Sequence, residues 1–338
     1  MFRIGIISAV LSCLVFLGGC GGTNSVETNN STDTKIIKIA NWYADDHAVN
    51  IALNEKFKPM VEENSGGTLK VEIYSNSKLG GEEAMYDSVR NGSLEMAEIG
   101  VIMEGEVPMI SILTLPFLFK DFEHAKKVLN GEVGNEIGEQ LEEITKVKFL
   151  GYGVNGLRSF SSNRPIEKMG DFKGYKVRTP NIPQLIETGH ALGATVTPMA
   201  ISEIFTALES KVVDGQDNPI STLRSNGWYE VQSHVLESQH LFLPNTIMAN
   251  GDFWNSLTTE QQEVVQEAIN ASVAYEWEVT EEFEVRDKEY LKEKGLTFIT
   301  PDEGFKKEMK DATEEIYNSF YEKNAWGKEI IEKIRSLE

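Results

Sequence analysis

The stretch from Leu257 to Lys294 contains neither glycine nor proline, and this constrains the fold more than any other feature of the chain. It opens with a capping-box pattern at Thr258 and Gln261, and it ends at Gly295. An apolar row with i+4 spacing runs along it: Val265, Ile269, Val273 and Trp277. An unbroken helix here would be roughly 54 Å long, whereas a domain of about 150 residues has a radius of gyration near 15 Å. Two helices with a break fit the sequence equally well, but an unbroken helix must bridge two lobes.

The rest of the chain alternates short apolar segments with helical patterns, which indicates an α/β fold. We expect strands at 35–42, 68–74, 94–101, 147–153 and 211–215, and helices at 48–63, 82–90, 121–129, 133–145, 183–192 and 202–209. About 300 residues remain after the N-terminal segment, which is long enough for two domains with separate cores.

The charge balance excludes some classes of partner. The chain has 53 acidic and 32 basic residues, which give a formal charge of −21. Such a chain repels nucleic acids and anionic membrane surfaces, so we expect no nucleic-acid partner. Its own ligand must therefore be chosen by a few local residues.

The N-terminus is typical of a targeting segment. Arg3 precedes an apolar run, 4–16, that is too short to span a bilayer. Leu17-Gly18-Gly19-Cys20 resembles a bacterial lipobox, which implies a signal peptide at 1–19 and a lipidated Cys20. Residues 20–35 would then form the acylated cysteine and a flexible polar tether. We expect a protein anchored outside the cytoplasmic membrane; the alternative is a simple secretory signal with an incidental cysteine.

One motif is misleading. Gly151 to Gly156 fits G-x-G-x-x-G, and it follows a predicted strand. A dinucleotide site also needs a helix to open at this point, so that the helix N-terminus faces the pyrophosphate. Residues 157–165 are instead extended and end in proline, so no nucleotide cofactor is expected.

Metal-binding and catalytic patterns are equally scarce. The five histidines are scattered without an H-E-x-x-H or Cys/His ligand spacing, and there is no G-x-S-x-G elbow. The many acidic residues could supply a glycosidase pair, but nothing in the sequence selects one. We therefore expect neither an enzyme nor a metal site, while a secreted carbohydrate-active enzyme and a structural lipoprotein remain the alternatives.

Two arginines occupy unusual places. Arg158 and Arg178 are each expected where a strand gives way to a loop, and ligands of open α/β sheets bind at such strand ends. A guanidinium fork matches the geometry of a carboxylate. Either arginine could equally be a surface partner for one of the many acids.

Several blocks of sequence together resemble one family. They are Asn163-Arg-Pro-Ile166, Gly170 to Pro180 (GDFKGYKVRTP), Leu192 to Met199 (LGATVTPM), Ser202 to Leu208 (SEIFTAL) and Val213 to Pro219 (VDGQDNP). In order and spacing they resemble the solute-binding proteins of tripartite ATP-independent periplasmic (TRAP) transporters. Segments 44–50, 76–81, 227–231 and 240–245 agree as well, so the resemblance covers nearly the whole chain after the N-terminal segment.

This resemblance implies two α/β lobes around a ligand cleft, joined by crossing strands and by an unbroken long helix. The expected lobes are 36–156 plus 245–283 and 157–244 plus 284–338. The resemblance also implies that the lobes close on an organic acid without converting it and present it to a membrane permease. We expect a monomer.

The resemblance assigns site residues position by position. Arg178 corresponds to the arginine that grips the ligand carboxylate, Arg158 to a second arginine near it, and Asn218 to a cleft asparagine. Four residues lie on segments that line the rest of the pocket: Tyr43, His47, Glu98 and His240. Ile201 stands where the family often has an aromatic wall residue, which leaves the ligand's shape open.

The charges favour one class of ligand. If both arginines hold one carboxylate, no cation remains for a second one, and Glu98 would repel it. A polyhydroxylated monoacid would instead use four side chains as hydroxyl partners: Glu98, His47, Tyr43 and Asn218. We therefore favour a sugar acid such as a hexuronate, with a C4-dicarboxylate or a keto acid as the alternatives.

Overall fold

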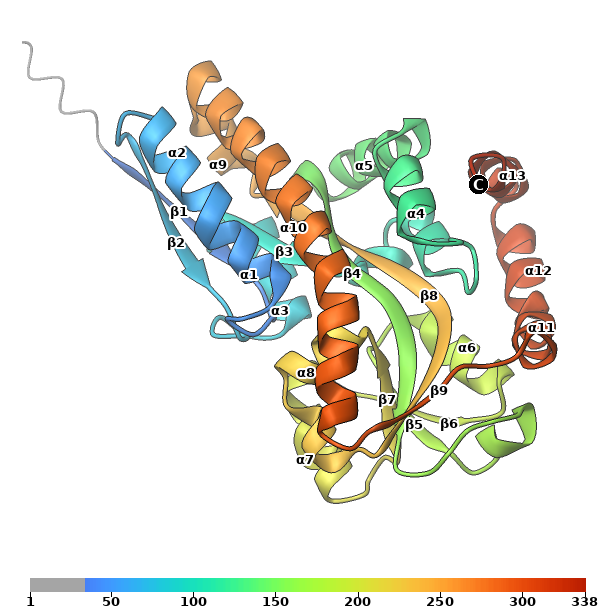
Figure 1. Ribbon diagram of the computed structural model, residues 1–338. Helices are drawn as coiled ribbons and strands as arrows, with labels where there is room; N and C mark the ends of the chain where they lie inside the picture. Colours follow the sequence, from blue (N-terminus) through green and yellow to red (C-terminus); the bar gives the residue numbers. More distant parts are fainter. Residues whose placement is uncertain (1–33) are drawn as a thin grey trace, which may run out of the picture. The chain divides into compact units, whose positions relative to one another are not determined.

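Two long antiparallel strands, β4 (Lys148–Ser162) and β8 (His234–Ala249), run through the centre of the computed structural model, which describes residues 34–338. They belong to one mixed sheet with the strand order β2-β1-β3-β8-β4-β7-β5-β6, and β9 also pairs with β8. The other strands are β1 (Lys35–Ala40), β2 (Leu69–Tyr74), β3 (Met96–Ile99), β5 (Lys176–Thr179), β6 (Thr195–Pro198), β7 (Gly215–Asn218) and β9 (Thr297–Ile299). Parallel pairs at both ends flank the antiparallel centre (Figure 1).

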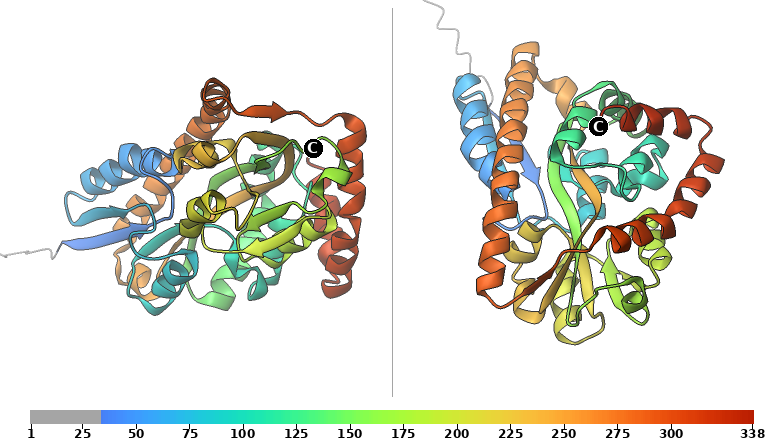
Figure 2. Two further views of the ribbon diagram at one scale, coloured as in Figure 1. Left: turned by 90° about the horizontal axis from the view of Figure 1, so that it is seen from below. Right: turned by 45° about the vertical axis from the view of Figure 1, so that its right-hand side comes forward.

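The expected long helix is unbroken. Helix α10 extends over Thr259–Glu293, and the Thr258 hydroxyl accepts from the amide of Gln261 while the Gln261 side chain accepts from the amide of Thr258. One part of α10 packs on α1 (Ala48–Ala52) and α2 (Lys58–Asn64), and another packs on α8 (Ile220–Ser225). The helix therefore bridges the two halves of the fold, as Figures 1 and 2 show.

The remaining helices lie around the sheet. They are α3 (Glu82–Asn91), α4 (Phe122–Leu129), α5 (Glu132–Thr145), α6 (Pro183–Ala191), α7 (Ile204–Glu209), α9 (Gly251–Ser256), α11 (Glu303–Ala312), α12 (Glu314–Lys323) and α13 (Gly327–Arg335). Among them, α4 and α5 pack on β4. Within residues 34–338, no helix is both long and apolar enough to cross a membrane.

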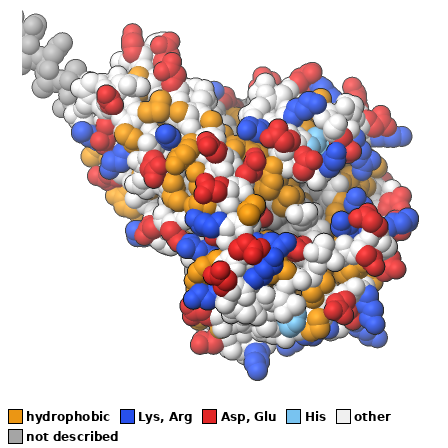
Figure 3. Space-filling view, in the orientation of Figure 1, with side chains coloured by type: hydrophobic (Ala, Val, Ile, Leu, Met, Phe, Trp, Pro, Cys, Tyr) orange, Lys and Arg blue, Asp and Glu red, His pale blue; other side chains and the backbone are white. Residues whose placement is uncertain are grey.

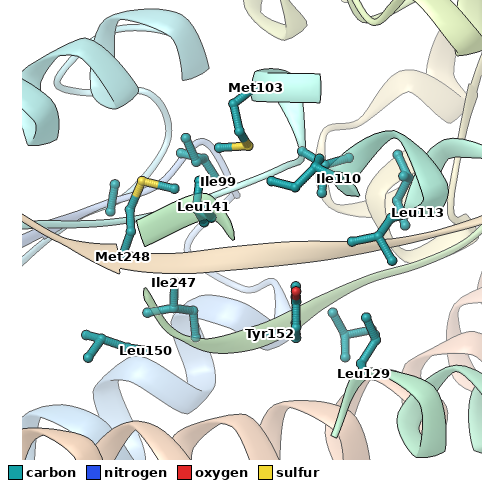
Figure 4. Close-up of a cluster of buried hydrophobic side chains, with 14 of the residues drawn as sticks. Ile99, Met103, Ile110, Leu113, Leu129, Leu141, Leu150, Tyr152, Ile247 and Met248 are labelled. Atoms are coloured by element: carbon teal, nitrogen blue, oxygen red, sulfur yellow. The ribbon is translucent and has the colours of Figure 1, made fainter. Parts of the chain in front are cut away.

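The apolar cores follow the two-lobed arrangement. The largest cluster fills the half built on β1 to β3, and Figure 4 shows part of it, including Ile99, Leu141 and Ile247. Smaller clusters lie in the other half, one around Phe160 and Phe172 and another around Trp228 and Leu208. On the face drawn in Figure 3, apolar side chains gather between α1 and α10, where Ile51 and Tyr275 pack on a small fourth cluster.

The C-terminal helices divide between the halves. Helix α11 packs against the second half through Phe305, whereas α13 packs on α4 and α5. The ring of His124 bonds the carbonyl of Ile334 at 2.9 Å, and Lys333 pairs with Glu132 at 2.7 Å. These contacts differ from the expected placement of all of 284–338 with the second lobe, because the apolar face of α13 is buried against the first one.

Three local expectations differ from the structure. The helix expected at 48–63 contains a π-helical segment, Leu53–Phe57, which ends two positions before Pro59, a residue without an amide hydrogen to donate. The strand expected at 147–153 continues to Ser162, so the G-x-G-x-x-G segment lies inside β4 and no helix opens there. The strand expected at 211–215 begins only at Gly215, because Lys211 has a left-handed backbone and closes a turn.

Candidate functional site

A polar cleft lies where the two halves meet, and the residues from the family-like blocks converge on it. An outer cavity of about 380 Å³ and a narrow inner extension share four lining residues: Glu82, Arg178, Pro180 and Ile201. The inner extension is further lined by Trp42, Gly100, Val101, Asn155, Arg158, Ile182, Asn218 and Leu243. The cleft therefore has walls from both halves of the fold.

Arg178 supplies a buried positive charge to this cleft. It is the third of the four residues in β5, and its side chain is 3% exposed. Its Nε and Nη2 atoms donate to the carbonyl oxygen of Met199 at 3.0 and 2.7 Å. Burial lowers the pKa of Arg178 to about 10, so the group stays charged at neutral pH. Among residues 34–338, no carboxylate is hydrogen-bonded to it, which leaves its charge available to a ligand.

Arg158 has a different environment, which the sequence did not reveal. It lies inside β4 rather than at its end, because the strand continues to Ser162. Its Nε and Nη2 donate to the two carboxylate oxygens of Asp217 at 2.9 and 3.0 Å, and Nη2 also donates to the Asp217 carbonyl. Burial alone would raise the pKa of Asp217, but Arg158 and His240 hold it well below its usual value. Arg158 therefore already has a carboxylate partner.

His240 lies beside the carboxylate of this ion pair. Its Nε2 lies 3.5 Å from an oxygen of Asp217, and its Nδ1 bonds the hydroxyl of Ser238 at 2.8 Å. The ring stacks on Phe160 with 4.2 Å between the centroids, and burial lowers the pKa of the imidazole. His240 does not line the cleft cavity, although it was expected on a lining segment. Its contacts are those of a group that orients Asp217.

Asn218 and Ile201 both line the cleft. Asn218 follows Asp217 on β7, opposite Ser159 of β4, and its side chain lines the inner cavity. Its amide donates to Gln216 at 2.6 Å, which fixes the orientation of the side chain. Ile201 lines both parts of the cleft and gives it an aliphatic wall.

Glu82 is a lining residue that sequence reasoning missed. It is the first residue of α3, and its Oε1 accepts from the indole of Trp42 at 3.0 Å and from the amide of Gly100 at 2.7 Å. Burial raises the pKa of Glu82, while the nearby Arg178 opposes this rise. The Leu79-Gly80-Gly81 turn directly before it was the only sequence signal, since it positions the start of α3.

Tyr43, His47 and Glu98 come together in a neighbouring buried cluster. The Tyr43 hydroxyl donates to Asn245 at 2.6 Å, and the Asn245 amide donates to Glu98 at 3.2 Å. The rings of Tyr43 and His47 stack at 4.2 Å. His47 Nδ1 accepts from the amide of Val49, so its Nε2 carries the hydrogen, and this atom has no partner. Burial lowers the pKa of His47 to about 3 and raises that of Tyr43 well above its ordinary value.

The structure thus separates the predicted site residues into groups. Arg158, Arg178, Asn218 and Ile201 line the cleft, while the cluster of Tyr43, His47 and Glu98 lies beside it. Cys20 lies outside the described residues. Between Thr34 and the end of the chain, no group of three or more His, Cys, Asp or Glu side chains converges as metal ligands would. A buried cation, fixed hydrogen-bonding groups and an aliphatic wall are suited to binding a small polar anion.

Comparisons with known proteins agree with this geometry. Residues 39–324 match the family described as bacterial extracellular solute-binding protein, family 7. A crystal structure of a TRAP periplasmic solute-binding protein from Haemophilus influenzae with bound L-gulonate is similar over 90% of this chain and 100% of its own, with 36% identity and a TM-score of 0.87.

The descriptions of two further relatives name a ligand. A TRAP periplasmic solute-binding protein from Roseobacter denitrificans with bound L-galactonate has 31% identity and a TM-score of 0.81, covering 90% of this chain and 99% of its own. The 2,3-diketo-L-gulonate-binding periplasmic protein of Escherichia coli is 32% identical over 73% of this chain and 75% of its own.

Proposed function

We propose, from the premise that this chain belongs to the bacterial extracellular solute-binding proteins of family 7, that it captures a sugar acid for a TRAP-type permease. The family binds solutes for transport and does not convert them. The cleft would close on the ligand carboxylate, and the closed protein would present the ligand to the membrane subunits.

Arg178 carries this proposal. It is a buried guanidinium on the wall of a 380 Å³ cavity, and its hydrogen bonds go to a carbonyl rather than to a carboxylate. A ligand carboxylate would supply the missing counter-charge. Asn218 would hold the same carboxylate, whereas Arg158 would contribute mainly its charge, because Asp217 already occupies two of its nitrogens.

Hydroxyl groups on the ligand would suit the rest of the site. The free oxygen of Glu82 can accept from a hydroxyl, and the buried Asn155 side-chain oxygen has no partner. His47 Nε2 and Glu98 Oε2 likewise have no hydrogen-bond partner. Together with Tyr43 they would bond the hydroxyl groups of a longer sugar acid at the end away from its carboxylate. A second carboxylate would meet Glu82 or Glu98 rather than a cation, which argues against a C4-dicarboxylate. The named ligands of the relatives, L-gulonate, L-galactonate and 2,3-diketo-L-gulonate, are of the favoured class.

A ligand screen tests this directly. Thermal shift with L-gulonate, galactonate, glucuronate, galacturonate, 2,3-diketogulonate, succinate, malate and pyruvate should show stabilisation by a sugar acid, about 2.7 kcal/mol at a hundredfold excess over Kd. Stabilisation by succinate or malate alone would replace the sugar acid with the dicarboxylate alternative. No shift with any acid would contradict the proposed function.

The role of Arg178 has its own test. Arg178→Ala should weaken the binding of the ligand found in the screen by about 2–5 kcal/mol, because the buried ligand carboxylate loses its partner. This corresponds to a loss of affinity of at least ~30-fold. Arg164→Ala is the matched control, since Arg164 lies on the loop after β4 and donates only to the Lys173 carbonyl. Calorimetry should show wild-type affinity in the control; wild-type affinity in Arg178→Ala would remove the assignment.

We further propose that the protein is a monomeric lipoprotein outside the cytoplasmic membrane, held by lipidated Cys20 and the 20–35 tether. This rests on the lipobox-like sequence alone. Expressed in a bacterial host, the wild type should be found in the membrane fraction and Cys20→Ala in the soluble extracytoplasmic fraction. We also propose that the lobes comprise 36–156 plus 245–283 and 157–244 plus 284–338, with α13 lying against the first lobe.

A further inference from the structure

Two carboxyl groups meet in the interior beside the cleft. Glu98 on β3 is 0% exposed and Glu276 on α10 is 1% exposed, and carboxyl oxygens of both side chains lie next to Gly153. Both lie against β4, where a Cβ added at Gly153 would collide with an oxygen of Glu98 and lie 2.9 Å from one of Glu276. The absence of a side chain at Gly153 therefore makes room for the pair.

No cation faces this pair. The groups around it are the amide of Val154 on β4, the side chain of Asn245 on β8, and Tyr43 and His47 from the β1–α1 segment. Tyr43 and His47 are both neutral at neutral pH, because burial raises the pKa of the first and lowers that of the second. No lysine or arginine among residues 34–338 contributes to the electrostatics of either carboxyl. Two buried carboxylates without a cation can coexist only if they hold protons.

The residues around the pair are close in sequence to residues that line the ligand cavity. Glu98 and two residues that contact the pair, Gly153 and Asn245, are each two positions from a residue that lines the inner cavity. These lining residues are Gly100, Asn155 and Leu243, respectively. A charge gained by the pair would therefore arise on the strands that form the cavity wall, in a low-dielectric interior where its field is weakly screened.

We propose that Glu98 and Glu276 form a proton-binding site that couples the capture of the anionic ligand to proton uptake. The coupling rests on the proposed function, whereas the proton site itself does not. At low pH both carboxyls are protonated; as the pH rises, the pair loses one proton and holds the other between its oxygens. The added negative charge repels a bound anion, and a bound anion in turn favours protonation of the pair.

The pH range follows from the direction of the shifts. Burial raises the pKa of Glu98 from 4.5 to about 7, and burial together with the charge of Glu98 raises the pKa of Glu276 well above its usual value. The native state thus binds more protons than the unfolded state between these values. The stability that these protons supply is fully present below pH about 4.5 and is lost as the pH rises towards and through 7.

Two variants distinguish the titration of the Glu98–Glu276 pair from that of another buried acid. In Glu98→Gln/Glu276→Gln the pair can no longer titrate, but the oxygens that accept from Asn245 and Val154 remain. Glu284→Gln is the matched control: Glu284 is also on α10, and burial raises its pKa to about 8, but it does not line the cavity. In urea unfolding from pH 5 to 9, the fall in stability with rising pH should be clearly smaller in the double variant than in the wild type, with only the part due to Glu284 remaining, whereas Glu284→Gln should keep the part that the pair causes. The same loss in the double variant would overturn the proton site.

Calorimetry with the sugar acid found in the screen tests the coupling. The wild type should bind it at least about fivefold more weakly at pH 8.5 than at pH 6 and should take up a fraction of a proton at pH 7, measured in buffers of different ionisation enthalpy. Glu284→Gln should behave in the same way, whereas the double variant should lose both effects whatever its absolute affinity. A pH-independent wild-type affinity without proton uptake would overturn the coupling.

The experiments still decide the proposal if no acid binds or if the double variant does not fold. If no acid binds the wild type, the proposed function and the coupling both fail, and the unfolding profiles alone decide the proton site. If the double variant does not fold, proton uptake by the wild type and by Glu284→Gln decides the proposal, because a positive result supports it and a null result overturns it.

Discussion

The ion pair between Arg158 and Asp217 should be one of the most sensitive points of the fold. Both side chains are 2% exposed and are joined by two parallel hydrogen bonds of 2.9 and 3.0 Å. Asp217→Asn keeps the size of the side chain but removes its charge, and its new amide group faces the guanidinium donors. An unpaired buried guanidinium of this kind typically costs about 3–5 kcal/mol of the free energy of unfolding.

Asp214→Asn is the matched control for this prediction. Asp214 precedes β7 on the same segment, is only partly buried, and accepts from the amide of Lys176 at 3.0 Å. An asparagine can still accept this hydrogen bond through its oxygen, so the control should lose about 1 kcal/mol or less. Urea unfolding at pH 7, with circular dichroism to confirm that the variants fold, measures both differences.

A second measurement follows from the same ion pair. In Asp217→Asn a ligand carboxylate could take the place of the lost partner of Arg158, so saturating sugar acid should raise the stability of this variant more than that of the wild type. If Asp217→Asn loses no more stability than Asp214→Asn, the energetic argument for the buried ion pair is refuted. If stability falls but ligand restores no more than in the wild type, Arg158 does not face the ligand carboxylate.

Three further changes test other contacts. Gly153→Ala should cost about 1–3 kcal/mol by overpacking against Glu98, whereas Gly170→Ala, where a Cβ meets nothing within 4 Å, should be nearly neutral in urea unfolding. Ile201→Trp should fill the cleft and weaken ligand binding at least tenfold in calorimetry while Tm changes by no more than about 2 °C, since surface-lining changes seldom affect stability. Asp46→Asn removes an ion pair to Arg224 that is partly exposed, so urea unfolding should show a loss of about 1 kcal/mol or less.

Local sequence signals predicted the elements that form without distant partners. The capping box at Thr258, the absence of glycine and proline, and the stop at Gly295 gave α10 nearly to the residue. Strand β8 left no comparable signal. It contains Pro244, which usually argues against a central strand, and it is held by pairing with β4 across register shifts that local patterns do not encode.

The residues of the candidate site also differ in whether a local sequence signal or a distant partner determines their role. Arg178 was recognisable because it lies near a strand end within a family-like block, and Asn218 belongs to another such block. Asp217 lies directly beside Asn218, yet its role depends on Arg158, which is 59 positions away and is brought to it only by the pairing of β4 with β7. Glu82 was missed for a similar reason, because its partners Trp42 and Gly100 come from other segments.

The sheet order also has a consequence for synthesis of the chain. Strand β3 ends at Ile99, but its partner β8 does not begin until His234, and the surface that α13 covers stays open until the last residues are made. A ribosome that adds about 5–20 residues per second needs roughly 7–30 s to cover that gap. During this time the nascent chain carries an unpaired edge on β3 and an unfinished apolar core. We expect such a chain to be prone to aggregation until β8 and α13 have been made.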